Sequence, residues 1–94
     1  MKLDDLLTIL ETRKKEVPEG SYTVRLLNTG EDEILKKVGE ETMEVILAAK
    51  GQGDQRLIEE IADLFYHTLV LLVARDLNLA DVEAELTRRH TPTE

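Results

Sequence analysis

Four acidic residues stand at matched spacing inside the most apolar part of the sequence. Glu41 and Glu44 form one i,i+3 pair, and Glu60 and Asp63 form a second pair after fifteen intervening residues. Residues three apart lie on one side of a helix, so each pair presents two carboxylates together. A carboxylate in apolar surroundings is unfavourable unless a cation or a proton neutralises it. Because an all-oxygen ligand set suits Mg²⁺ or Mn²⁺ better than Zn²⁺, the spacing predicts a site for one of these two ions; the alternative is that the pairs are ordinary solvent-exposed charges.

Two predicted helices carry these acids, one over residues 31–50 and one over residues 54–76. The turn Gly51-Gln52-Gly53 separates them, as expected from the tendency of glycine to end helices. Thr29 and Asp32 resemble a capping box at the start of the first helix. Because so short a turn makes neighbouring helices antiparallel, the two acidic pairs can lie opposite each other.

The first of these helices has an apolar stripe beside its acidic pair. The stripe consists of Ile34, Val38, Val45 and Ala49. At about 100° per residue, Glu41 falls inside or beside this stripe, and Lys37 and Glu44 lie on its flank. Glu40 points away from the stripe, and its role stays open between a surface charge and a catalytic base.

The second helix places its acids on one face with Arg56 and His67. Arg56 can pair with Glu60 one turn later, and we interpret His67 as an interior histidine or a dimer contact rather than a ligand. The opposite face consists of Ile58, Ala62, Phe65, Leu69, Leu72 and Val73. From Ile61 onward the helix is apolar nearly all round, and one short hairpin cannot bury both of its faces. The pattern therefore predicts a symmetric helical dimer.

Two further helices are predicted, one over residues 1–16 and one from Asn78 or Asp81 to about His90. Residues 20–30 show weak periodicity, and because long connections in small domains are often functional, we predict a lid or ligand loop there. Aromatic residues make up only 3% of the chain, which favours helices packed on helices over a sheet. The 94 residues thus predict a single all-α domain, residues 1–94, with four to five helices.

The formal net charge is −8, and the sequence contains no long basic run. Duplex nucleic acid and anionic membrane are not expected as main partners, because both bind basic surfaces. An anionic small substrate remains compatible with this charge if a cation bridges it to the acids. The most apolar run, Leu64–Ala74, has 11 residues and is too short to span a bilayer. The N-terminus carries Asp4 and Asp5 where a signal peptide has basic residues, so we expect a cytoplasmic protein.

The acidic motif and the sequence around it resemble a known enzyme family. Glu41-x-x-Glu44 followed by Glu60-x-x-Asp63 is similar to the signature of the MazG-like, all-α nucleotide pyrophosphohydrolases. Three segments closely resemble the phosphoribosyl-ATP pyrophosphohydrolases of histidine biosynthesis: PEGSYTVRLL (18–27), ILKKVGEETMEVILAAK (34–50) and IEEIADLFYHTLVLLVARDL (58–77). The similarity covers nearly the whole chain and is weakest at its two ends.

The resemblance implies Mg²⁺-dependent hydrolysis of 1-(5-phosphoribosyl)-ATP to 1-(5-phosphoribosyl)-AMP and pyrophosphate. It implies a MazG-like helical bundle completed by dimerisation, as a homodimer or a dimer-built oligomer, with the four acids as metal ligands and catalytic residues. Glu40 is a further catalytic candidate. The substrate-binding candidates are Lys37, Arg25, Ser21, Tyr22 and Thr23, and the alternative for the last four is a role in ordinary capping and packing. Because the chain is too short to include the cyclohydrolase domain fused to this activity in some organisms, we expect a stand-alone form.

Two rival functions stay open at the level of sequence. A related enzyme could act on a canonical or damaged nucleoside triphosphate with the same acids, and residues 21–27 and the C-terminal helix would then carry the difference. A non-catalytic helical dimer could instead bind a metal or a partner protein. Such a dimer would keep the apolar stripes but would not require acids at both inward pairs.

Overall fold

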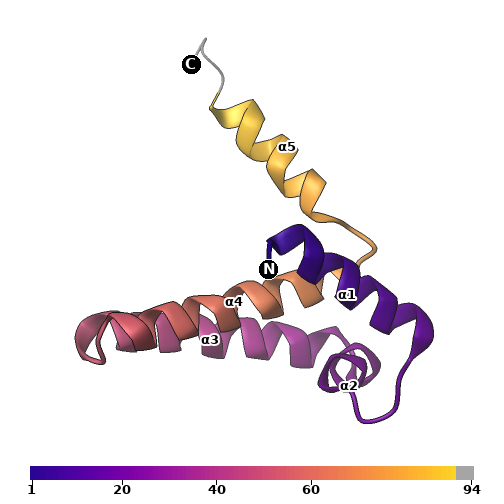
Figure 1. Cartoon of the computed structure of the whole chain (residues 1–94), viewed down its shortest axis with the longest axis horizontal. Helices are drawn as coiled ribbons and strands as arrows, with labels where there is room; N and C mark the ends of the chain where they lie inside the picture. The colour runs from indigo at the N-terminus through magenta and orange to yellow at the C-terminus, as the bar shows by residue number, and fades with distance from the viewer. Residues whose placement is uncertain (91–94) are drawn as a thin grey trace.

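The computed structural model describes residues 1–90, and within them the chain forms five helices and no strand (Figure 1). In chain order the helices are α1 (Leu3–Glu16), α2 (Tyr22–Thr29), α3 (Glu31–Gly51), α4 (Asp54–Ala74) and α5 (Leu79–Arg89). The predicted all-α class is confirmed. The predicted single domain extends to residue 94 and therefore ends outside the described residues.

Helices α3 and α4 form a long antiparallel hairpin, and α1 and α2 pack against its open end (Figure 1). Three acids in the first turn of α3 complement the positive end of the helix dipole. The capping box predicted from Thr29 and Asp32 is wrong. Gly30 occupies the N-cap position with a φ of 100°, and the Thr29 hydroxyl donates to the Leu26 carbonyl instead, at 3.2 Å.

The loop predicted over residues 20–30 is also wrong, because most of it is helix α2; ligand binding by this segment stays a prediction. Ser21 begins this helix by accepting a hydrogen bond from the Val24 backbone N–H at 3.3 Å, and Gly30 ends it. Thr23 and Leu26 are buried one turn apart. Two inward positions in a helix of eight residues are too few to produce a recognisable period, so the sequence pattern looked irregular.

The core lies at the open end of the hairpin, where α1, α2, α3 and α4 meet. It consists of Leu7, Leu10, Leu26, Ile34, Leu69, Val70 and Val73. Ile34 of the predicted stripe is buried, but Ala48 rather than Ala49 is buried at the far end of α3. The helix is therefore rotated slightly from the orientation that the sequence predicted.

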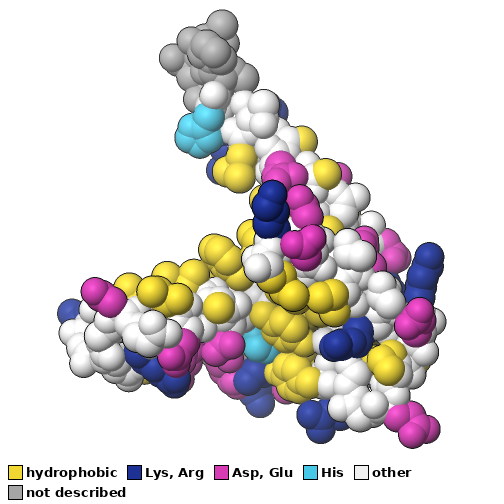
Figure 2. Space-filling view, viewed as in Figure 1, with side chains coloured by type: hydrophobic (Ala, Val, Ile, Leu, Met, Phe, Trp, Pro, Cys, Tyr) yellow, Lys and Arg dark blue, Asp and Glu magenta, His cyan; other side chains and the backbone are white. Residues whose placement is uncertain are grey.

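Much apolar surface remains exposed along one edge of the hairpin, which Figure 2 shows as a row of hydrophobic side chains. Ile58 is 60% exposed, Met43 54% and Phe65 47%. A groove of about 540 Å³ continues this surface between α4, α1 and α5. Its apolar lining consists of Leu3, Phe65, Leu69, Leu72, Leu79, Val82 and Leu86.

Helix α5 leads away from the hairpin as an arm (Figure 1). Asn78 and Asp81 begin it together, since each side chain accepts a hydrogen bond from the backbone N–H of the other. The predicted start at one of these two residues is confirmed. Of the five described helices, none combines the length and the apolar character needed to cross a membrane.

Candidate active site

The four predicted acids line one hollow between α3 and α4, with a volume of about 300 Å³. We call it the acidic hollow, and its lining consists of Lys37, Glu40, Glu41, Glu44, Arg56, Glu60 and Asp63. The hairpin places charged side chains along the edge opposite its apolar row (Figure 2). The expected juxtaposition of the two acidic pairs is therefore present.

Three of the acids converge closely enough to share a metal ion. Glu41, Glu60 and Asp63 each offer a carboxylate oxygen, and these oxygens lie within 4.8 Å of one another. Carboxylate oxygens that lie this close together could hold one Mg²⁺ ion, with water completing its ligands. The donors are all oxygen, which fits a hard cation. Glu44 lines the same hollow but does not belong to this convergent set.

Glu60 is the most buried of these acids, with 3% of its side chain exposed. Burial raises the pKa of its carboxyl, and the negative charges of Asp63, Glu41 and Glu44 raise it further. The Arg56 guanidinium opposes these effects from 2.8 Å away. The predicted pair between Arg56 and Glu60 is confirmed. The acids around this pair still carry excess negative charge, which additional positive charge would stabilise.

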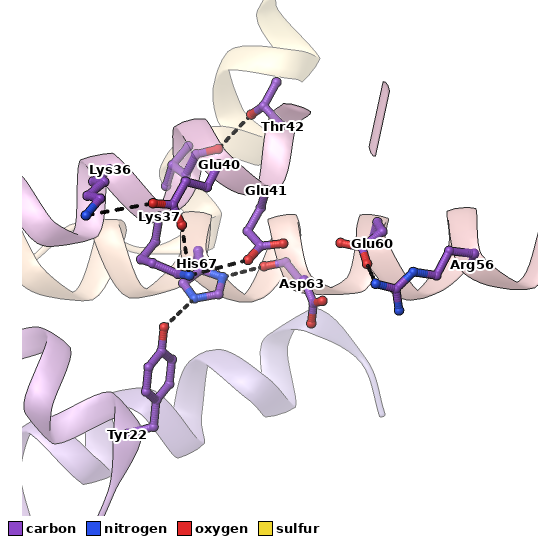
Figure 3. A network of polar contacts seen from close by, with 11 residues as sticks. Tyr22, Lys36, Lys37, Glu40, Glu41, Thr42, Arg56, Glu60, Asp63 and His67 are labelled. Atoms are coloured by element: carbon purple, nitrogen blue, oxygen red, sulfur yellow. Dashed lines mark hydrogen bonds and ion pairs between the residues drawn. The ribbon is translucent and has the colours of Figure 1, made fainter. Parts of the chain in front are cut away.

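Lys37 supplies the second cation of the acidic hollow. Its ammonium lies 3.1 Å from a Glu40 oxygen and 3.8 Å from a Glu41 oxygen (Figure 3). The hydrogen bond to Glu40 raises the pKa of Lys37, so the side chain is firmly cationic at neutral pH. Glu40 itself is half exposed and also lies 4.0 Å from Lys36. A lysine and a carboxylate thus stand together at the rim of the hollow.

His67 is buried behind the site and both of its ring nitrogens have partners, as Figure 3 shows. Its Nδ1 lies 2.8 Å from the Asp63 carbonyl oxygen, which can only accept, so Nδ1 carries the proton. Nε2 then accepts a hydrogen bond from the Tyr22 hydroxyl at 3.0 Å. The predicted interior histidine is confirmed, and it connects α2 to the turn of α4 that carries Asp63.

The other predicted substrate residues on α2 have different surroundings. Ser21 caps the helix, and Thr23 is buried with its hydroxyl bonded to that of Tyr66. Arg25 lies over the Tyr22 ring, with 5.7 Å between its guanidinium carbon and the ring centroid. None of the four predicted substrate residues near α2 (Ser21, Tyr22, Thr23 and Arg25) lines the acidic hollow. Sequence reasoning missed Tyr66, although its position next to His67 on α4 was an available signal.

The fold and the site define a class: an all-α protein that directs carboxylates from two antiparallel helices to one point, beside a lysine and an arginine. Among known proteins, one family has a sequence profile that matches residues 3–90. The chain belongs to this family, the phosphoribosyl-ATP pyrophosphohydrolases.

Proteins named phosphoribosyl-ATP pyrophosphatase are similar along most of the chain. One from Clostridium botulinum is 52% identical over 87 residues, covering 93% of this chain and 79% of the relative. One from Leptospira biflexa is 50% identical over 91 residues, covering 97% of this chain and 96% of the relative. One from Trichlorobacter lovleyi is 54% identical over 87 residues, covering 93% and 81%.

Proposed function

We propose that this chain hydrolyses 1-(5-phosphoribosyl)-ATP to 1-(5-phosphoribosyl)-AMP and pyrophosphate, an early step of histidine biosynthesis. Family membership supports the substrate. The observation that carries the chemistry is the convergence of carboxylate oxygens from α3 and α4 within 4.8 Å, beside two cationic side chains. The enzyme is a hydrolase that acts on a phosphoric anhydride.

The proposed cofactor is Mg²⁺, held by Glu41, Glu60 and Asp63, with Glu44 as a nearby fourth carboxylate. When bound, the ion neutralises charge on phosphate oxygens and so makes phosphorus easier for water to attack. Burial and, to a smaller extent, the neighbouring acids raise the pKa of Glu60, so a negative charge at this position is unfavourable in the free site. This effect favours occupation by a divalent cation.

The side chains at the rim of the hollow bind the substrate and move the proton. Lys37 and Arg56 direct positive charge toward the phosphate oxygens while holding Glu40 and Glu60 in place. In the reaction a water oxygen bonds to phosphorus and the anhydride bond between the α- and β-phosphates breaks. Glu40 is half exposed beside Lys37, and we assign it the proton that the attacking water loses.

The proposed substrate contacts on α2 divide into two kinds. Tyr22 and Arg25 have exposed side chains and can reach a ligand directly. Ser21 and Thr23 act through α2, because the first caps the helix and the second binds it to α4 through Tyr66. Their replacement is expected to change substrate affinity through the placement of Tyr22 and Arg25.

We further propose that the chain is a cytoplasmic enzyme, one domain over residues 1–94, that works as a homodimer. The exposed apolar row on α3 and α4 and the groove beside α5 together form an uncovered apolar surface, and contiguous surfaces of this kind are typical of interaction sites. A second copy of the chain offers the same surface and can bury it by two-fold symmetry. The charged edge of the hairpin remains free for substrate.

The test is a pyrophosphate-release assay with purified protein, Mg²⁺ and phosphoribosyl-ATP. We expect release of pyrophosphate and 1-(5-phosphoribosyl)-AMP, with much slower turnover of canonical nucleoside triphosphates. Preferred turnover of a canonical or damaged triphosphate would assign the chain to a related enzyme. Absence of hydrolysis for every triphosphate, in folded protein that binds Mg²⁺, would leave only a binding function.

A further inference from the structure

A second hollow lies next to the acidic one, between α2 and the start of α3, with a volume of about 490 Å³. We call it the α2–α3 hollow, and its lining consists of Tyr22, Arg25, Leu26, Thr29, Asp32 and Glu33. Glu33 stands one helical turn before Lys37 of the acidic hollow. Tyr22 lines the α2–α3 hollow, and its hydroxyl bonds to His67, whose other ring nitrogen bonds to the carbonyl of Asp63 of the acidic hollow (Figure 3). This side chain therefore lies between the two hollows. A ligand that fills both would pass Tyr22.

The Tyr22 ring offers a surface that attracts cations. Tyr22 is 40% exposed as a residue, and its ring stacks on that of Tyr66, with 6.2 Å between centroids and an interplanar angle of 22°. The hydrogen bond to His67 holds the hydroxyl and therefore the ring. A cation already lies over this ring, namely the Arg25 guanidinium at 5.7 Å. Asp32 and Glu33 add two carboxylates to the same hollow.

The proposed substrate differs from ATP in charge as well as in size. A substituent on N1 uses the lone pair of that nitrogen, so the adenine ring of phosphoribosyl-ATP is cationic at neutral pH. The adenine ring of ATP is neutral. The N1 substituent also ends in a phosphate group. Both molecules contain the same α–β anhydride, so the carboxylates of the acidic hollow cannot distinguish them by the bond to be cleaved.

We propose that the α2–α3 hollow binds the cationic, N1-substituted adenine ring and selects phosphoribosyl-ATP against ATP by its charge. The ring lies against Tyr22 and near the carboxylates of Asp32 and Glu33. Arg25 leaves the Tyr22 ring and pairs with the phosphate of the N1 substituent. This assignment rests on the proposed function, and it makes Tyr22, Asp32 and Glu33 specificity-determining residues for that reaction.

The test compares kcat/KM for phosphoribosyl-ATP, ATP and 1-methyl-ATP, which has the cationic ring without the phosphoribosyl group. We expect the wild type to prefer 1-methyl-ATP over ATP by about 2- to 30-fold, the range of a cation–π contact. The double variant Asp32→Asn/Glu33→Gln should reduce this ratio toward one, and so should Tyr22→Leu. Tyr22→Phe keeps the ring and should retain the ratio.

A matched control and a pH series separate this role from a structural one. Asp54→Asn removes one negative charge at the opposite end of the hairpin (Figure 1) and should leave the ratio unchanged. Raising the pH until the methylated ring loses its proton should abolish the preference in the wild type. The double variant, having little preference, should show no such pH dependence. Circular dichroism melts establish that each variant is folded.

The outcomes are distinct from those of the proposed function. If the wild type hydrolyses phosphoribosyl-ATP but turns over 1-methyl-ATP no faster than ATP, charge selection is overturned and the function stands. A preference that survives in both Tyr22→Leu and the double variant also overturns it. If phosphoribosyl-ATP is not hydrolysed by folded, Mg²⁺-loaded wild type, the function fails and this inference fails with it.

Discussion

Replacing Lys37 with methionine should impair catalysis far more than folding. The Lys37 ammonium lies 3.1 Å from Glu40 and 3.8 Å from Glu41, at the rim where a substrate phosphate would approach. A charge-assisted contact to phosphate contributes roughly 1.5–3 kcal/mol, so Lys37→Met should lower kcat/KM about 10- to 150-fold. Mg²⁺ affinity without substrate should be retained or increased, because a positive charge has left the site.

The loss of stability in this variant should be small. Glu40 is half exposed, and an ion pair of that kind contributes about 0.2–1 kcal/mol. For a domain of this size that corresponds to a change in Tm of at most about 8 °C. Steady-state kinetics, calorimetric titration of Mg²⁺ and a thermal melt on the same preparation measure all three quantities.

Lys36→Met is the matched control, since Lys36 is the neighbouring lysine, is 65% exposed and lies 4.0 Å from Glu40. It should change kcat/KM by less than about twofold, as expected for an exposed charge. The reasoning is refuted if Lys37→Met keeps the wild-type kcat/KM. An unchanged kcat/KM with a large fall in Tm would identify Lys37 as a structural counter-ion for the acids.

Three further results are expected. Mg²⁺ at about 100 times its Kd should stabilise the wild type by about 2.7 kcal/mol in a thermal melt. The variants Glu41→Gln and Asp63→Asn should each lose this stabilisation and most of the activity. A normal response to Mg²⁺ in either variant would remove that residue from the site. Light scattering at micromolar concentration should show a dimer, and Phe65→Glu should weaken it; a stable wild-type monomer would contradict the proposed interface. The hydrogen bond to Arg75 lowers the pKa of Glu31 below its ordinary 4.5. The Glu31–Arg75 pair therefore stabilises the fold fully above pH 4.5, and this stabilisation is lost as the pH falls through the lowered pKa. Arg75→Met should therefore lower Tm at neutral pH and converge with the wild type in acid, and a constant difference across the series would argue against this pair.

The local features of the site follow from the sequence alone, because helix periodicity places residues three and four apart on one face. The spacing of Glu41 and Glu44 and of Glu60 and Asp63 predicted two inward acidic pairs, and both line the hollow. The pairing of Arg56 with Glu60 is a relation within one helical turn and was predicted for the same reason. Apolar residues all round α4 also indicated a surface that one hairpin cannot cover.

Relations between distant segments were decided by tertiary structure. The bond from Tyr22 to His67 joins residues 45 apart, and that between Glu31 and Arg75 joins residues 44 apart. Helix α2 was missed because burial of Thr23 and Leu26 against other helices, rather than a long local period, stabilises it.

The choice of Glu41, and not Glu44, for the convergent set depends on the rotation and register of α3 against α4. Sequence periodicity specifies which face of a helix is apolar, but its precision is about one residue, as the burial of Ala48 in place of Ala49 shows. A rotation of that size decides which carboxylate meets those of the facing helix. The sequence therefore identified the acidic residues of the site, and the packing of α3 against α4 decided which of them converge.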